Sequence, residues 1–400
     1  MPARLLIVGA SARAAAQSAH RAGIAVSAVD LFADQDLCEI ADVISCPAHD
    51  YPQALPALAA RLPASPFCYV GGLENHPEVV AELQATRPLL GVPPATLRRC
   101  RDPFQLLELA QREGLSIPET RYDPPDPADD ASWLRKPFAS SGGLGMQLCC
   151  SADSIASQAG QAIGVSSRHY FQRYQPGTVC AGSFWADANG CRLLGVSHQL
   201  TAGARCGAAA QFAYAGSVGP LVLDPADAQA WDTLGRCVAH HFQLEGLFGI
   251  DAICANAPGA APMMLEVNPR YTASMELWDL VSSPLGQPEW LPLMGAWLGA
   301  TRSEASGRPR AAGKFILYAQ RSQSITPQWL ARLRNYLRAG EWLADIPRVP
   351  LGVAAGRPIT TVIVTGRSYQ SVLARVHTLA RETESLTGGA AERPSSGSRG

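Results

Sequence analysis

The sequence predicts a multidomain protein that opens with an α/β domain and continues with α+β regions. Its length of 400 residues favours two to four domains over one very large domain. The first 30 residues form a strand–helix–strand pattern, and residues 133–268 contain pairs of strands interrupted by a single long helical pattern. Hydrophobic residues make up 47% of the chain and charged residues 17%, which is enough apolar material for a packed core.

The N-terminal pattern predicts a Rossmann-like domain over residues 1–95. A short apolar strand, "RLLIVG" (4–9), precedes a helical stretch and a second strand that ends at Asp30. A further buried strand follows in "PFCYVGG". Such alternation predicts a parallel sheet with helices on both faces. The turn after the first strand reads G-A-S-A-R-A and lacks two glycines of a dinucleotide-binding turn, so a tight turn before a packed helix is favoured.

Composition excludes several classes of function. The formal net charge is −1, which argues against a nucleic-acid partner. No apolar run reaches the roughly 18 residues of a membrane span, and the N-terminal apolar run is too short for a signal peptide. The eleven cysteines form no CxxC pair, so we expect reduced thiols in a cytoplasmic protein, and a zinc site would need scattered ligands.

A strand pair near residue 260 carries candidate metal ligands. In "LEVNPR", Glu266, Asn268 and Arg270 alternate and therefore share one face of a strand. If the preceding turn centres between residues 258 and 259, the residue numbers of two partners on facing strands add up to about 517. This places Asp251 opposite Glu266. Two facing carboxylates repel unless a cation lies between them, and oxygen donors suit Mg²⁺. The alternative is a pair of edge acids neutralised by Arg270.

A glycine-rich hairpin supplies candidate phosphate ligands. The stretch "KPFASSGGLGM" places Lys136 on a strand and residues 140–145 at the hairpin tip. Glycines allow backbone N–H groups to approach phosphate oxygens, and a lysine adds a point charge. Taken alone, the pattern fits a plain flexible loop equally well.

Taken together and in this order, the motifs "RKPFASSGGLGM", "FQRYQPG", "GIDAI" and "LEVNPR" resemble those of the carboxylate–amine ligases of the ATP-grasp superfamily. The resemblance covers about residues 1–320. It implies a Rossmann-like pre-domain followed by a two-subdomain ATP-grasp fold and a small C-terminal α/β segment. The implied boundaries are 1–95, 96–180 for the small subdomain, 181–310 for the large subdomain, 311–385, and a disordered tail at 386–400.

The resemblance also implies roles for individual residues. Lys136 would contact the α- and β-phosphates of ATP, and Arg270 would face the transferred phosphoryl group or a substrate carboxylate. Glu74, just after a strand of the first domain, would bind substrate, although an acid favoured by a helix N-terminus is an equal alternative. The other implied ligands are Ser140, Ser141, Gly142, Gly143 and Gly145 for the β- and γ-phosphates, Gln172 and Tyr174 for adenine, and Asp251, Glu266 and Asn268 for Mg²⁺ or Mn²⁺.

Two departures from the family pattern stand out. A second phosphate-binding lysine usually follows an aspartate at the start of the helix near residue 103, where this chain has Pro103 after Asp102. Arg99 or Arg101 could substitute. The adenine hinge usually carries an acid for the ribose hydroxyls, and this stretch offers Gln172 and Thr178 instead.

The predicted function is therefore an ATP-dependent ligase that forms an amide through an acyl phosphate, with a small acid and a small amine as substrates. The alternatives are a non-catalytic ATP-binding protein of the same fold and a carboxylase-type ATP-grasp enzyme that uses bicarbonate. Smaller likenesses, such as "GKFILYAQ", resemble the tyramine–glutamate ligase of methanofuran synthesis and its relatives in one-carbon metabolism. A homodimer is compatible with the sequence, which does not fix the oligomeric state.

Overall fold

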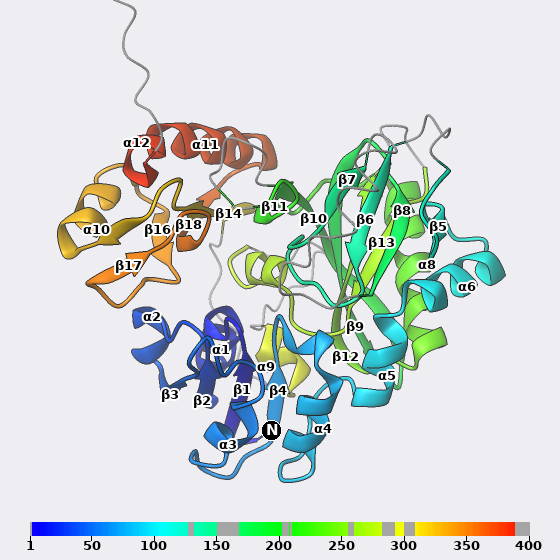
Figure 1. Ribbon diagram of the computed structural model, residues 1–400, viewed down its shortest axis with the longest axis horizontal. Helices are drawn as coiled ribbons and strands as arrows, with labels where there is room; N and C mark the ends of the chain where they lie inside the picture. Colours follow the sequence, from blue (N-terminus) through cyan, green and yellow to red (C-terminus); the bar gives the residue numbers. More distant parts are fainter. Residues whose placement is uncertain are drawn as a thin grey trace, which may run out of the picture.

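The structure is a computed structural model that describes residues 2–126, 132–149, 168–201, 208, 210–254, 260–281, 293–299 and 309–388. The described strands form one sheet of eight strands, two of four and one of two. In Figure 1 the N-terminal domain lies at the bottom, the two sheets with the predicted site lie at the right, and the C-terminal segment lies at the upper left.

The N-terminal domain has the predicted α/β architecture. Its four strands run parallel in the order β3-β2-β1-β4. The carboxylate of Asp30, at the end of β2, accepts a 2.6 Å hydrogen bond from the backbone N–H of Ala12 beside the start of α1. A side chain of the protein thus satisfies the position where a dinucleotide phosphate would bind. The elements are β1 (Arg4–Gly9), α1 (Arg13–Arg21), β2 (Ala25–Asp30), α2 (Gln35–Cys38), β3 (Ala41–Ser45), α3 (Leu55–Ala59), β4 (Phe67–Tyr69), η1 (Leu73–Asn75) and α4 (Pro77–Gln84).

Two helices lead from this domain to the small sheet, whose strand order is β5-β8-β6-β7. The second helix begins at Pro103, and Asp102 caps it by accepting from the N–H of Phe104 at 2.9 Å. It ends at Gly114, whose φ of 66° lies in the left-handed region that favours glycine. The elements are α5 (Pro94–Cys100), α6 (Pro103–Glu113), β5 (Thr120–Arg121), β6 (Trp133–Pro137), β7 (Gln147–Cys149) and β8 (His169–Arg173).

The large sheet joins regions that the sequence analysis separated. Its order is β13-β12-β9-β10-β11-β14-β18-β16, so the strands after residue 310 continue the sheet that begins beside the predicted metal site (Figure 1). The expected boundary at residue 180 falls inside β9. The elements are β9 (Thr178–Asp187), β10 (Gly190–Thr201), β11 (Tyr214–Gly219), α8 (Pro225–Phe242), β12 (Gly246–Cys254), β13 (Met263–Asn268), β14 (Ala311–Tyr318), β16 (Glu341–Ala344) and β18 (Pro358–Gly366).

The C-terminal segment extends beyond its predicted end at residue 385. Leu386, expected to belong to a disordered tail, is buried, and its carbonyl accepts from the Trp329 indole at 3.1 Å. The helix that begins at Pro327 stops at Arg334, where the chain tightens into successive turns such as Tyr336 N–H to the Leu333 carbonyl. Residues 389–400 lie outside the described part. The remaining elements are η2 (Ala273–Leu277), α9 (Leu293–Trp297), β15 (Gln323–Ile325), α10 (Pro327–Arg334), β17 (Leu351–Val353), α11 (Tyr369–Glu382) and α12 (Glu384–Thr387).

A buried group of charges fastens the N-terminal domain to the rest of the molecule. The guanidinium of Arg13, on α1, pairs with both carboxylate oxygens of Glu276 on η2 and with Asp345 after β16 (2.7 Å). Lys314 on β14 adds a 2.6 Å contact to Glu276. Asp36 on α2 accepts from the backbone N–H of Asp345 at 3.1 Å. We call these five residues the Arg13 cluster.

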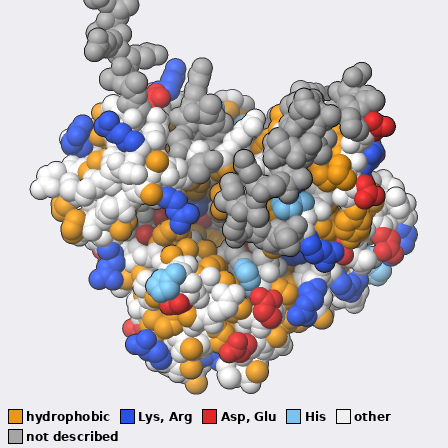
Figure 2. Space-filling model, in the orientation of Figure 1, with side chains coloured by type: hydrophobic (Ala, Val, Ile, Leu, Met, Phe, Trp, Pro, Cys, Tyr) orange, Lys and Arg blue, Asp and Glu red, His pale blue; other side chains and the backbone are white. Residues whose placement is uncertain are grey.

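The described residues can also be checked for membrane-spanning helices and for disulfide bonds. None of their helices is long and apolar enough to cross a membrane. The nine cysteines among them are all free thiols. Figure 2 shows Lys, Arg, Asp and Glu side chains spread over this face of the molecule, on the N-terminal domain at the bottom and on the parts above it.

Candidate active site

The three predicted metal ligands lie together on the β12–β13 hairpin. Asp251 pairs with Glu266, and Gly249 pairs with Asn268, which is the predicted register. The side-chain amide of Asn268 lies 3.1 Å from Asp251 Oδ2 and 3.3 Å from Glu266 Oε1. The oxygen of the same amide, Oδ1, lies 3.4 Å from Arg101 Nη1. Two carboxylates and one amide oxygen on a single face fit the ligand preference of Mg²⁺.

The electrostatics of the pair are those of two carboxylates held too close for both to ionise freely. Burial and the neighbouring Glu266 charge raise the pKa of Asp251 well above its usual range. Burial would also raise the pKa of Glu266, but the nearby cations Arg101 and Lys136 outweigh it and lower that pKa to about 2. The described residues contain no group of three His, Cys, Asp or Glu side chains that could hold a metal ion. The set predicted here falls outside that definition, since its third donor, Asn268, is an amide.

Lys136 on β6 lies near enough to Glu266 for its positive charge to help lower the pKa of that acid. Its ammonium donates to the side-chain oxygen of Gln172 on β8 at 3.1 Å, and that amide donates in turn to Thr120 on β5. Gln172 is 1% exposed, whereas Tyr174, two residues further on, is 39% exposed. The structure thus places Gln172 beside the predicted phosphate lysine and leaves the Tyr174 ring at the surface.

The glycine-rich loop between β6 and β7 is fastened across the site at three places. The carbonyl of Ser140 accepts from Asn75 on η1 and from Arg101, both at 2.9 Å. The carbonyl of Gly142 accepts from the backbone N–H of Tyr214 at 3.0 Å. Gly143 has a φ of +75°, and a Cβ there would lie 1.9 Å from the Phe212 carbonyl oxygen, so only glycine fits.

Glu74 and Arg270 form a buried pair although they lie 196 residues apart in the sequence. Arg270 Nη2 lies 2.6 Å from Glu74 Oε1. Burial would raise the pKa of Glu74, but the Arg270 guanidinium lowers it below its usual range, so the acid is ionised. Ser141 of the glycine-rich loop contacts the same Oε1 at 3.5 Å. Arg270 is therefore oriented by Glu74, and the pair meets the loop.

The arginines of the 98–101 stretch have separate environments. Arg101 points inward and contacts Glu266 Oε2 at 3.3 Å and Asn268 Oδ1 at 3.4 Å. Arg99 points outward, to the carbonyl of His241 at 3.2 Å. Arg98 is exposed. Helical spacing in α5 and the turn that follows it separate them, so Arg101 alone of these three reaches the predicted site.

Sequence reasoning missed one contact in β10. Gln199 donates to Asp251 Oδ1 at 2.6 Å and so orients a predicted metal ligand. His198, the residue before it, faces α11 and lies 3.0 Å from the Tyr369 hydroxyl. Adjacent residues of a strand face opposite sides, so only one of the two can reach the hairpin.

Several buried polar atoms in this region have no protein partner among the described residues. They include Glu74 Oε2, whose residue is only 1% exposed, and the Nε atoms of Arg101 and Arg270. Buried polar atoms are rarely left unpaired, so such atoms gathered in one place indicate a binding site. We use the name site cluster for the residues of this region that carry charge or a metal-type donor: Glu74, Arg101, Asp251, Glu266, Asn268 and Arg270.

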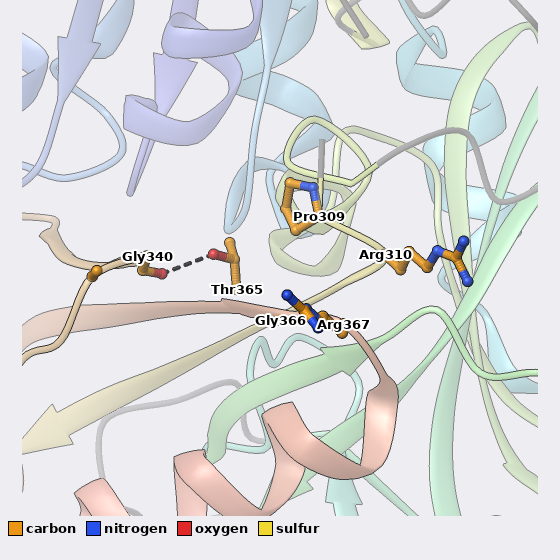
Figure 3. A pocket seen from close by; sticks show the side chains of 7 residues that line it. Pro309, Arg310, Gly340, Thr365, Gly366 and Arg367 are labelled. Carbon is orange, nitrogen blue, oxygen red and sulfur yellow. Dashed lines mark hydrogen bonds between the residues drawn. The ribbon is translucent and has the colours of Figure 1, made fainter. Parts of the chain in front are cut away.

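A hollow of about 570 Å³ is lined by residues from the C-terminal part of the chain, which are distant in sequence from the site cluster. Figure 3 shows Thr365 donating to the Gly340 carbonyl at 2.9 Å beside Arg310 and Arg367. The residues that line it include no acid, so they offer no carboxylate for a metal: Pro309, Arg310, Ala339, Gly340, Thr365, Gly366 and Arg367.

Comparison with known families identifies the region that holds the site. Residues 100–274 match the family model described as an ATP-grasp domain. The chain carries an ATP-grasp domain. The match contains Arg101, Lys136, the glycine-rich loop and the β12–β13 hairpin, whereas Glu74 precedes it. No characterised protein matches the chain by sequence.

Solved structures share their fold with nearly the whole chain. The biotin carboxylase domain of Hydrogenobacter thermophilus 2-oxoglutarate carboxylase, in complex with MgADP, ADP and bicarbonate, has a TM-score of 0.68 at 13% identity, covering 96% of this chain and 90% of its own. The carboxyaminoimidazole ribonucleotide synthase of Aspergillus clavatus, in complex with ATP, has a TM-score of 0.69 at 13% identity, covering 96% and 98%. An N5-carboxyaminoimidazole ribonucleotide synthetase in complex with ADP has a TM-score of 0.68 at 14% identity, covering 96% and 97%. The predicted fold class is confirmed.

Proposed function

We propose that this protein is an ATP-dependent ligase that activates a substrate carboxylate as an acyl phosphate and joins it to an amine. The observation that carries the proposal is the convergence, in an ATP-grasp domain, of Asp251, Glu266 and Asn268 with Lys136 and the glycine-rich loop. Oxygen donors and phosphate-binding groups that meet at one place have a common use in phosphoryl transfer.

In this proposal the chain supplies binding, orientation and charge. Asp251, Glu266 and Asn268 hold Mg²⁺, which would offset negative charge on the phosphate oxygens when bound. Lys136, fixed by Gln172 at 3.1 Å, presents an ammonium to the phosphates. The backbone of the glycine-rich loop covers them from the other side. Such a site acts by positioning and preorganised charge, with little covalent chemistry from side chains.

The substrate side of the proposal rests on the buried pair Glu74 and Arg270. Glu74 Oε2 is an ionised acceptor without a partner among the described residues, which suits a ligand with N–H donors such as an amine. Arg270 Nε is a buried donor that also has no partner among the described residues, which suits a carboxylate or phosphoryl oxygen of a ligand. The carboxylate attacks the γ-phosphorus, ADP leaves, and the amine then attacks the acyl carbon and releases phosphate.

An acyl phosphate must be protected from water. The loop contacts of Ser140 with Asn75 and Arg101 hold the glycine-rich loop against the N-terminal domain, directly beside Glu74. Closure of this kind excludes solvent from reactive intermediates. The substrate pair and the phosphate cover therefore lie within one connected set of contacts.

ADP release tests the function directly. We would screen Mg-ATP with a panel of amino acids and amines, singly and in pairs, and follow ADP and phosphate. The proposal expects ADP only when an acid and an amine are both present, with equal amounts of ADP, phosphate and amide. ADP formed without any new amide, for every pair, would contradict it.

A second candidate is a carboxylase-type enzyme in which bicarbonate is the acid. Its support is the likeness in fold to proteins such as the biotin carboxylase domain that was solved with bicarbonate. In the same assay, ADP release that depends on added bicarbonate and not on an organic acid would select it.

A third candidate is an ATP-binding protein without efficient turnover. Pro103 stands where a phosphate lysine is usual, and Gln172 stands at the place of the ribose acid. Binding of Mg-ATP without ADP release against any panel member would favour this candidate. The narrower assignment to tyramine–glutamate ligase relatives stays a prediction, which tyramine and glutamate in the panel would test.

A further inference from the structure

The contacts of Arg101 suggest a role that follows from the proposed function and goes beyond it. The guanidinium is almost enclosed, with 11% of its side chain exposed. Its Nη1 contacts Glu266 Oε2 at 3.3 Å and Asn268 Oδ1 at 3.4 Å, and its Nη2 donates to the Ser140 carbonyl at 2.9 Å. One side chain thus joins two of the proposed metal donors to the loop proposed to cover the phosphates.

Arg101 and a divalent ion would use the same oxygen atoms. A metal bound by Glu266 and Asn268 needs the lone pairs that now face Nη1, and two cations within a few ångströms repel each other strongly in an enclosed site. The contacts at 3.3 and 3.4 Å are long for charge-assisted hydrogen bonds. The guanidinium can therefore leave these oxygens at modest cost if a better acceptor is offered.

The triphosphate of ATP is such an acceptor. Two phosphate oxygens can bind both arms of an arginine side chain, with hydrogen bonds that are shorter and stronger than the contacts of Nη1 with Glu266 and Asn268. Nη2 already lies on the loop that would cover the phosphates, and Nε has no partner among the described residues, so the guanidinium has donors to give. Arrival of the nucleotide would draw Arg101 away from Glu266 and Asn268.

We propose that Arg101 makes metal binding at Asp251, Glu266 and Asn268 conditional on the nucleotide. Alone, the metal must displace a guanidinium from its donors. With the nucleotide, the phosphates take the guanidinium and release those donors. Nucleotide and metal then raise each other's affinity, because such coupling is reciprocal.

The test is the affinity for Mn²⁺, followed by electron paramagnetic resonance, with and without a non-hydrolysable ATP analogue. Removal of the Arg101 charge in Arg101→Gln should tighten Mn²⁺ binding without nucleotide by about tenfold, within the usual range of site-to-site coupling. The factor by which the analogue improves Mn²⁺ affinity should fall by about fivefold or more. Arg99→Gln removes a neighbouring charge that faces outward, and it should leave both quantities at the wild-type value.

Two further variants keep the result interpretable. If Arg101→Gln does not fold, Arg101→Met removes the charge while it retains a long apolar stem, with the same expectation. Arg101→Lys restores a charge and should return nucleotide-free Mn²⁺ affinity toward wild type. Mn²⁺ affinity without nucleotide that is unchanged or weaker in the charge-removing variants overturns this inference. Failure of the wild-type protein to bind the analogue with Mn²⁺ overturns the proposed function itself.

Discussion

The Arg13 cluster and the site cluster both bring arginines together with acidic side chains, and they differ in how completely their polar atoms are paired. In the Arg13 cluster, the described contacts leave no buried polar atom without a partner. In the site cluster, Glu74 Oε2 and the Nε atoms of Arg101 and Arg270 have none among the described residues. A fully paired network fixes the fold, whereas an incompletely paired one keeps hydrogen-bonding capacity for a ligand.

The Arg13 cluster and the site cluster also differ in where they lie in the fold. The Arg13 cluster connects α1, η2, β14 and the turn after β16, which are parts of the fold that must keep one arrangement. The site cluster lies beside the glycine-rich loop, whose Ser140 carbonyl accepts hydrogen bonds at 2.9 Å from Asn75 and Arg101. The comparison predicts that substitutions in the Arg13 cluster lower the stability of the fold, whereas substitutions in the site cluster lower ligand binding or turnover.

The largest effect should come from the metal donors. Glu266→Ala removes a carboxylate that the site needs against metal and phosphate charge, so ADP release should fall by about 10³-fold or more. The thermal midpoint should fall less than it does when the Arg13 cluster is broken, because the Glu266 side chain is 33% exposed whereas that of Glu276 is 3% exposed. Turnover close to wild type would refute the assignment of this hairpin.

The matched change in the other group is Arg13→Met. It leaves Glu276 and Asp345 buried without their guanidinium, and broken buried ion pairs cost about 3–5 kcal/mol. We expect a lower urea midpoint for unfolding while the remaining folded protein keeps its ATP affinity. A variant with normal stability and weakened ATP binding would reverse the comparison.

The glycine-rich loop should show an intermediate effect. Gly143→Ala places a methyl group 1.9 Å from the Phe212 carbonyl oxygen, which must push the loop away from its closed position. Since displacements of about 1 Å at a site can cost about 10²-fold in rate, ADP release should fall by one to two powers of ten. Gly190→Ala is the control, because Gly190 also has a positive φ but nothing within 4 Å of the added Cβ.

The smallest effect is a pH dependence beside the Arg13 cluster. Burial and the charges of Asp345, Asp30 and Asp36 raise the pKa of Asp34 from 3.8 to about 8. The folded state therefore binds a proton that the unfolded state releases, so stability falls as pH rises from about 4 to 8. Asp34→Asn should remove that loss.

The measurement is the free energy of unfolding of wild type and Asp34→Asn at pH 5 and pH 9. One pKa unit corresponds to about 1.4 kcal/mol, so the advantage of the variant should grow by more than about 1 kcal/mol between the two. An advantage that is equal at both pH values would show that Asp34 does not titrate in this range.

The sequence predicted the local geometry of the site well, because that geometry is set by short-range rules. Period-two alternation and a short turn were enough to place Asp251 opposite Glu266, and the glycine pattern located the loop. Pairings over long sequence separations were out of reach, as with Glu74 and Arg270, which lie 196 residues apart. The inward turn of Arg101 depends on how α5 packs, which the spacing of three arginines does not reveal.

The most direct test is the thermal midpoint of the wild-type protein with ATP alone, with Mg²⁺ alone and with both. A ligand present at about 100 times its dissociation constant adds about 2.7 kcal/mol to stability. We expect a rise of several degrees only with ATP and Mg²⁺ together, and none in Glu266→Ala. The same rise with ATP alone, or no rise with both, would contradict a metal-dependent nucleotide site at Asp251, Glu266 and Asn268.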